Sequence, residues 1–147
     1  MTRPAKGPAA PSHPPFTDEE RALRGSLFRV RPLVAVAVGG AAGGLIRTAL
    51  AEISSGWPWP TLLVNISGAF LLGLVVMYGR RHWPGALIAG VAVGGLGAFT
   101  TFSTMTGELW EFFDAGEWGT LALYGLASVV GGILAAVTGV RLGRTVR

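Results

Sequence analysis

The chain contains no cysteine and little charge. Its 147 residues include two His, eight Asp or Glu and twelve Lys or Arg, so that 14% of the residues are charged. The absence of cysteine excludes disulfides, thiolate metal ligands and thiol nucleophiles. Because the acids lie mostly outside the apolar runs, few side chains remain for acid–base chemistry. We therefore expect that the protein is not an enzyme.

Apolar residues and glycine are abundant instead. Half of the residues are hydrophobic and 23 are glycine, without the three-residue period of collagen. This balance is typical of an integral membrane protein, in which glycine lets helices pack closely. The net charge of +4 could indicate nucleic-acid binding, but the basic residues flank apolar runs. Membrane topology explains that placement better, and we expect no nucleic-acid partner.

Four apolar segments predict an all-α membrane protein with four transmembrane helices. About 20 apolar residues cross the hydrocarbon core of a bilayer. The predicted spans are residues 33–51, 61–79, 86–113 and 120–140, within a four-helix domain of residues 31–147. Residues 1–30 are predicted to form a disordered basic cytoplasmic tail, in which a short amphipathic helix could begin at Thr17.

The basic residues are divided unevenly between the two ends of the predicted helices. Eleven of the twelve Lys and Arg residues lie in the two tails and in the loop after the second span, and the twelfth, Arg47, lies inside a span. Positive charge favours the cytoplasmic side. We therefore predict a multi-pass protein of the cell membrane with both termini in the cytoplasm.

The third segment is too long for one straight span and contains an unusual stretch, GGLGAFTTFSTMTGE, from Gly94 to Glu108. Glycines weaken a helix, and hydroxyl side chains can bond the backbone groups that a break releases. A break inside a membrane survives only where it is buried in protein or lines a cavity. We predict a break near Gly97–Thr104, and broken helices are common ion sites.

Polar residues inside the other spans have two interpretations each. Arg47 either extends toward the membrane surface, or it forms part of a vestibule that attracts anions or a structural hydrogen bond to a partner. Asn65 more often makes a hydrogen bond between helices than binds a ligand, although its amide is a suitable donor to a dehydrated anion. Tyr124 and Ser128 are four residues apart, and they either bond across helices or line a pore.

Three motifs together resemble the Fluc/CrcB family of fluoride channels. These motifs are GGAAGGLIR (Gly39 to Arg47), LLVNISGAFLLG (Leu62 to Gly73) and the stretch from Gly94 to Glu108. They occur in the family's order, and the resemblance covers about residues 33–141. It implies a passive fluoride channel, built as an antiparallel dimer with the third helix broken.

The resemblance also implies roles for individual residues. Gly97 and Thr100 match the backbone-carbonyl ligands of a central, structural Na⁺ that is not transported. The residues that match the fluoride pore are Asn65, Phe102, Met105, Tyr124 and Ser128. A vestibule or structural role is left for Arg47, Thr101, Ser103, Thr104 and Glu108.

Two features depart from the family pattern. Met105 replaces a second phenylalanine, and a thioether lacks the positive ring edge that can face an anion. The uneven basic residues favour one orientation in the membrane, whereas dual-orientation members have balanced charge. We therefore leave open whether the antiparallel partner is a second copy or an oppositely oriented paralogue that supplies the missing ring.

Two other functions remain as alternatives. A small four-helix exporter of drugs or cations would need a membrane-buried carboxylate for proton coupling. The carboxylates of Glu52 and Glu108 lie near predicted span ends, which disfavours this class. A non-conducting partner subunit of a heterodimeric channel would have the same motifs, but mutation of Asn65 or Phe102 would leave the flux unchanged.

Overall fold

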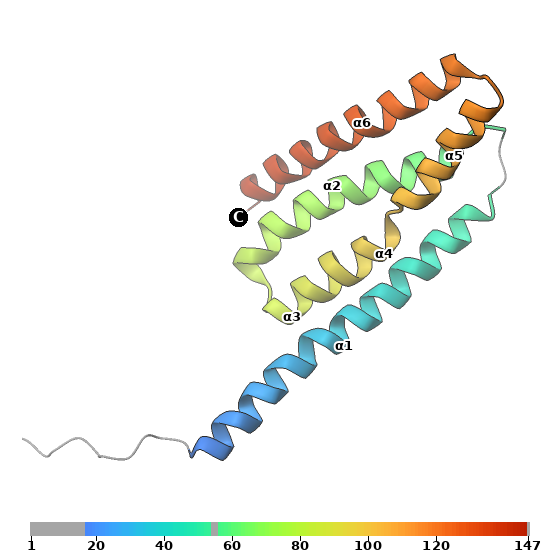
Figure 1. Cartoon of the computed structure of the whole chain (residues 1–147). Helices are drawn as coiled ribbons and strands as arrows, with labels where there is room; N and C mark the ends of the chain where they lie inside the picture. The colour runs from blue at the N-terminus through green and yellow to red at the C-terminus, as the bar shows by residue number, and fades with distance from the viewer. Residues whose placement is uncertain (1–16, 54–55, 147) are drawn as a thin grey trace, which may run out of the picture.

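The computed structural model describes residues 17–53 and 56–146, and within these ranges it contains helices and no strands (Figure 1). The long helices are α1 (Asp18–Ala51), α2 (Trp59–His82) and α6 (Trp118–Thr145). The segment between α2 and α6 consists of four shorter elements. They are α3 (Gly85–Ile88), the π-helix η1 (Ala89–Leu96), α4 (Gly97–Phe99) and α5 (Phe102–Asp114).

Four helical segments are long and apolar enough to cross a membrane, which confirms the predicted four-helix membrane protein. They are Val30–Ala51, Trp59–His82, Gly85–Asp114 and Trp118–Thr145. Each extends slightly beyond its predicted bounds, because the helices continue into the polar and aromatic residues that flank the apolar runs.

The first helix is long and continuous. Helix α1 begins at Asp18, directly after Thr17, where we expected a short amphipathic helix to begin, and it continues through the first span; residues 1–16 lie outside the described part. At about 1.5 Å per residue, α1 is roughly 51 Å long, against about 30 Å of hydrocarbon. Its first turns therefore project beyond the membrane-spanning part.

The helices pack in two close pairs, with the third segment between α1 and α2 (Figure 1). A Cβ added to Gly43 of α1 would overlap the carbonyl group of Gly95 in η1. A Cβ added to Gly139 of α6 would overlap the carbonyl oxygen of Phe70 in α2. Glycine is thus required where α1 meets η1 and where α2 meets α6, because the backbones touch.

A single copy of the chain buries few of its large apolar side chains. The buried apolar residues of the described part are Leu62, Val64, Ala92 and Tyr124. Large apolar side chains elsewhere are exposed, including Phe102 at 74% and Leu45 at 72%. In water such a surface would cause aggregation. The faces of this bundle therefore suit contact with lipid or with another protein.

Candidate functional site

The third segment is interrupted at two residues. Helix α4 ends at Phe99 and α5 begins at Phe102, while Thr100 (φ −77°, ψ 154°) and Thr101 (φ −143°, ψ 122°) have extended backbone. Both extended residues lie within the stretch Gly97–Thr104, for which the break stays a prediction. The preceding glycines do not lie at the interruption itself, since Gly94 and Gly95 belong to η1 and pack against α1.

Asn65 satisfies the backbone at the interruption. Its Nδ2 donates to the carbonyl oxygen of Thr101, and the Thr101 N–H donates to Asn65 Oδ1, both at 2.8 Å. Thr101 is buried, and each unpaired group there would cost about 1–3 kcal/mol. Of the two interpretations of Asn65, the structure therefore shows the hydrogen bond between segments.

The hydroxyl of Thr101 caps the N-terminus of helix α5. Its Oγ1 accepts from the N–H of Thr104 at 3.2 Å, which is a helix N-cap. The hydroxyls of Thr104 and Ser103 lie 2.9 and 3.3 Å from the same oxygen. Three hydroxyl residues that the sequence placed at the break are thus one hydrogen-bonded cluster.

Glu108 joins three helices through its carboxylate. The Thr61 hydroxyl donates to Oε1 at 2.6 Å, and the Tyr124 hydroxyl donates to Oε2. Thr61 and Tyr124 are both buried, and the rings of Trp57 and Phe112 contact Tyr124 edge-on. Sequence reasoning missed Thr61. An ordinary threonine at the start of a span gives no local signal for a contact 47 residues away.

Arg47 lines a small recess together with four threonines. This recess, which we call the arginine recess, has a volume of about 220 Å³. Its polar lining residues are Arg47, Thr48, Thr61, Thr101 and Thr104. The Thr48 and Thr61 hydroxyls already donate to the Gly44 carbonyl and to Glu108. The guanidinium of Arg47 and a hydroxyl of the Thr101–Thr104 cluster are the donors that the recess can offer to an anion. The structure thus brings Arg47 beside the interruption and beside the threonine that bonds Glu108.

A second recess of about 330 Å³ lies along the interruption, and we call it the interruption recess. It is lined by Asn65, Gly68, Ala69, Leu72, Ala92, Leu96, Gly97, Thr100, Thr101 and Phe102. Both residues expected to bind Na⁺, Gly97 and Thr100, therefore line the same recess as Asn65 and Phe102. Within the described ranges, no cluster of His, Asp or Glu side chains could hold a metal ion.

Other predicted site residues lie apart from the two recesses. Tyr124 and Ser128 are on α6, where both are buried. The Ser128 hydroxyl has no hydrogen-bond partner among the described residues. Met105 is half-buried in the first turns of α5, three residues after the exposed Phe102. Tyr124, Ser128 and Met105 line neither recess, whereas Phe102 lines the interruption recess.

The helices and recesses together define a small multi-pass membrane protein with polar groups gathered at a helix interruption. The chain belongs to the family described as CrcB-like protein, Camphor Resistance (CrcB), whose model matches residues 34–140. This match spans all four membrane segments and both recesses. It excludes the N-terminal residues, including the first turns of α1.

Similar proteins from several bacteria are named as fluoride-specific ion channels. A protein of Magnetococcus marinus named "Fluoride-specific ion channel FluC" is 42% identical over 118 residues, which are 76% of this chain and 96% of the relative. A relative of the same name from Thermus thermophilus is 42% identical over 74% of this chain and 90% of its own. "Fluoride-specific ion channel FluC 1" of Mycolicibacterium paratuberculosis is 40% identical over 80% of this chain and 93% of its own.

Proposed function

We propose that this protein is a subunit of a fluoride-specific channel that lets cytoplasmic fluoride leave the cell passively and so relieves its toxicity. The observation that carries the proposal is the arginine recess, which Arg47 lines together with Thr101 and Thr104 beside the interruption. The names of relatives about 40% identical support fluoride as the anion.

The chemistry of these groups suits a small, strongly hydrated anion. A pore must replace the water that fluoride loses, and hydroxyl, amide and guanidinium groups can all donate hydrogen bonds to it. The ring edge of Phe102 carries partial positive charge and can face an anion without holding it tightly. Conduction requires binding that is favourable but weak enough for release. The inside-negative potential then drives the anion outward, by about 2.3 kcal/mol per charge per 100 mV.

An antiparallel dimer would place two interruptions against each other. Phe102 is 74% exposed, and Gly97 beside it is exposed as well, so the interruption recess lies on an open face. Backbone carbonyls are suitable ligands for a hard cation. We propose that Gly97 and Thr100 of two subunits supply four carbonyls to one structural Na⁺ at the centre of the dimer, while Asn65 keeps the neighbouring Thr101 backbone paired.

The charge distribution argues for one orientation, with both termini in the cytoplasm. An antiparallel partner would then be an oppositely oriented paralogue. Curated relatives in other bacteria have numbered names, such as "FluC 2" of Staphylococcus saprophyticus. We propose that a partner of this kind supplies the phenylalanine that Met105 replaces.

The test is fluoride efflux from liposomes, measured with a fluoride electrode. The chain is reconstituted alone and together with its paralogue, with chloride efflux as the control for leakage. Fluoride efflux in either case supports the channel, and full activity of the chain alone contradicts the need for a paralogue. Unchanged flux after Asn65→Ala and Phe102→Ala would instead indicate a non-conducting partner.

A proton-coupled exporter is tested in the same liposomes. Glu108 does lie within a membrane-spanning segment, but its two oxygens accept from Thr61 and Tyr124. A channel would give fluoride efflux that follows the membrane potential without a pH gradient. Transport that stops when the pH gradient is removed would favour the exporter.

A further inference from the structure

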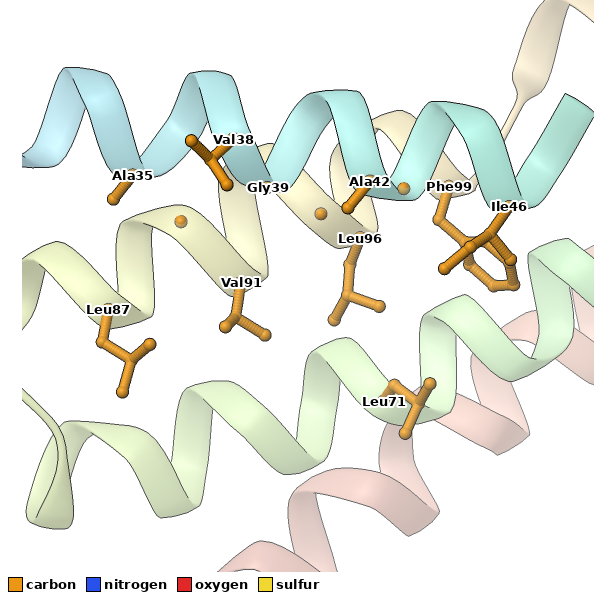
Figure 2. A pocket seen from close by; sticks show the side chains of 13 residues that line it. Ala35, Val38, Gly39, Ala42, Ile46, Leu71, Leu87, Val91, Leu96 and Phe99 are labelled. Atoms are coloured by element: carbon orange, nitrogen blue, oxygen red, sulfur yellow. The ribbon is translucent and has the colours of Figure 1, made fainter.

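A long apolar groove lies between α1, α2 and the third segment. Its volume is about 590 Å³, and its lining is almost entirely apolar. Figure 2 shows the side chains of Val38, Ala42 and Ile46 on α1 facing the same space as Leu71 of α2 and Val91 of η1. No polar side chain lines the groove, so a hydrated or charged ligand would lose its hydrogen bonds there. Its occupant should be a hydrocarbon chain.

The groove and the interruption recess lie on different sides of the third segment. Of all their lining residues they have only Leu96 in common. The recess contains Asn65 and Phe102, whereas the groove is walled by α1, which contributes nothing to the recess. A subunit that contacted only the side around Phe102 would therefore leave the groove open to the bilayer.

Three arginines lie at one end of the groove. Ala35 and Leu87 line this end, and the exposed Arg31 lies one helical turn before Ala35. The exposed Arg80 and Arg81 lie in the last turn of α2. That turn packs against α3, since a Cβ added to the adjacent Gly79 would lie 3.3 Å from Ile88. The end of α2 and the start of α3 are joined by a short loop, so Arg80 and Arg81 lie at the same end of the bundle as Leu87 and Arg31.

We propose that the groove binds one acyl chain of an acidic phospholipid, with its phosphate held by Arg31, Arg80 and Arg81. The apolar lining matches the chain, and clustered arginines next to a membrane span attract anionic headgroups. Guanidinium groups also bind phosphate oxygens in pairs of hydrogen bonds. The proposed lipid site thus differs from the proposed fluoride site in both its ligand and its location.

Native mass spectrometry of the full chain in detergent tests the proposal. The protein is titrated with palmitoyl-oleoyl phosphatidylglycerol or with phosphatidylcholine of the same chains, and bound lipid is counted. We expect a Kd at least about tenfold lower for phosphatidylglycerol. Equal Kd values for the two lipids would overturn the proposal.

Two sets of variants separate the chain site from the headgroup site. Ala42→Phe fills the groove and should weaken the binding of both lipids about tenfold. Ala41→Phe, at an exposed position outside the groove, should leave lipid binding unchanged. Replacing Arg31, Arg80 and Arg81 by Gln should reduce phosphatidylglycerol binding to the level of phosphatidylcholine. The matched control replaces Arg141 and Arg144 of α6, at the same end of the bundle. Equal effects of a variant and its control would contradict the assignment.

A measurement on the unmodified chain removes any dependence on folding of the variants. Phosphatidylglycerol with a photoreactive diazirine in its acyl chain should cross-link to the α1 segment 38–46 and to Val91. Cross-links that favour outward residues of α6, such as Leu126 and Ile133, would overturn the proposal. So would efficient disulfide formation between two copies that contain Ala42→Cys, because a second copy would then cover the groove.

Discussion

Asn65 and Thr101 form a two-way hydrogen-bonded pair across 36 positions of the chain. The amide donates to the Thr101 carbonyl and accepts from the Thr101 N–H, each at 2.8 Å. One side chain of α2 thus satisfies the backbone of Thr101, which is extended and outside the helical hydrogen-bond pattern. The pair gives both polar groups of the Thr101 backbone a partner within the protein, as an interruption in an apolar environment requires.

Asn65→Asp should destabilise the fold, because it keeps the acceptor for the Thr101 N–H but removes the donor to the Thr101 carbonyl. We expect a loss of about 1–3 kcal/mol in the free energy of unfolding, measured by thermal denaturation in detergent. Ser67→Ala is the control, since the Ser67 hydroxyl only donates to carbonyls of its own helix. An Asn65→Asp variant as stable as the Ser67→Ala variant would contradict the role of the pair.

The bond between Tyr124 and Glu108 gives a second test. Tyr124→Phe leaves the ring contacts with Trp57 and Phe112 in place but removes the hydroxyl that donates to Glu108. A hydrogen bond contributes about 0.5–1.5 kcal/mol between neutral groups and about 1.5–3 kcal/mol where one group is charged. We expect a loss of that size in unfolding measurements, together with slower fluoride efflux. Tyr78→Phe, near the C-terminal end of α2, is the matched control and should change neither the free energy of unfolding nor the fluoride efflux. Equal losses from both variants would contradict the role of the Tyr124 hydroxyl.

The four spans could be predicted because each one is a local signal. A run of about 20 apolar residues indicates a membrane helix wherever it occurs. The contacts of Glu108 could not be predicted, because Thr61 is 47 residues away and its hydroxyl looks like many others. The π-helical turns of η1 were also missed, since no residue pattern in Ala89–Leu96 separates wide turns from ordinary ones.

The glycine spacing in α1 indicates a close helix contact, but it does not specify which glycines make that contact. The motif GGAAGGLIR contains two overlapping Gly-x-x-x-Gly pairs, a spacing that lets two helices pack closely. Gly39 and Gly43 form one pair, and both meet the backbone of η1. The overlapping pair Gly40 and Gly44 has the same spacing in the sequence. Yet a Cβ at Gly44 would meet nothing within 4 Å in the described structure. Which of two such pairs is used depends on how the helix is rotated against its neighbour, and the motif does not specify that rotation.

Gly43 and Gly44 therefore form a matched pair of test sites. Gly43→Ala must separate α1 from η1, because its Cβ would overlap the Gly95 carbonyl group. Forcing an extra carbon into a packed contact costs about 1–3 kcal/mol. Gly44→Ala should instead be neutral or stabilise the helix by up to about 1 kcal/mol. Thermal denaturation of the two variants decides, and equal melting temperatures would contradict this packing of α1 on η1.

Met105→Phe tests whether the missing ring limits flux through the chain alone. Met105 is three residues after Phe102 in α5, so the two side chains lie on neighbouring positions of one helix. If an aromatic edge is needed there, Met105→Phe should raise fluoride efflux by about tenfold or more in liposomes that contain this chain alone. Met105→Leu changes the side chain without adding a ring and should have no such effect. Equal efflux from the two variants would show that the ring is not the limiting feature.

The orientation of the chain can be measured directly, because its sequence contains no cysteine to interfere. Asp114→Cys places a thiol at the end of α5, and Thr145→Cys places one at the end of α6, both at exposed positions. Positive charge is retained in the cytoplasm, and eleven of the twelve basic residues lie on the side of the termini. A membrane-impermeant maleimide should therefore label Asp114→Cys in intact cells, and Thr145→Cys only after permeabilisation. Similar labelling of both variants in intact cells would show two orientations, and the antiparallel partner would then be a second copy of the same chain.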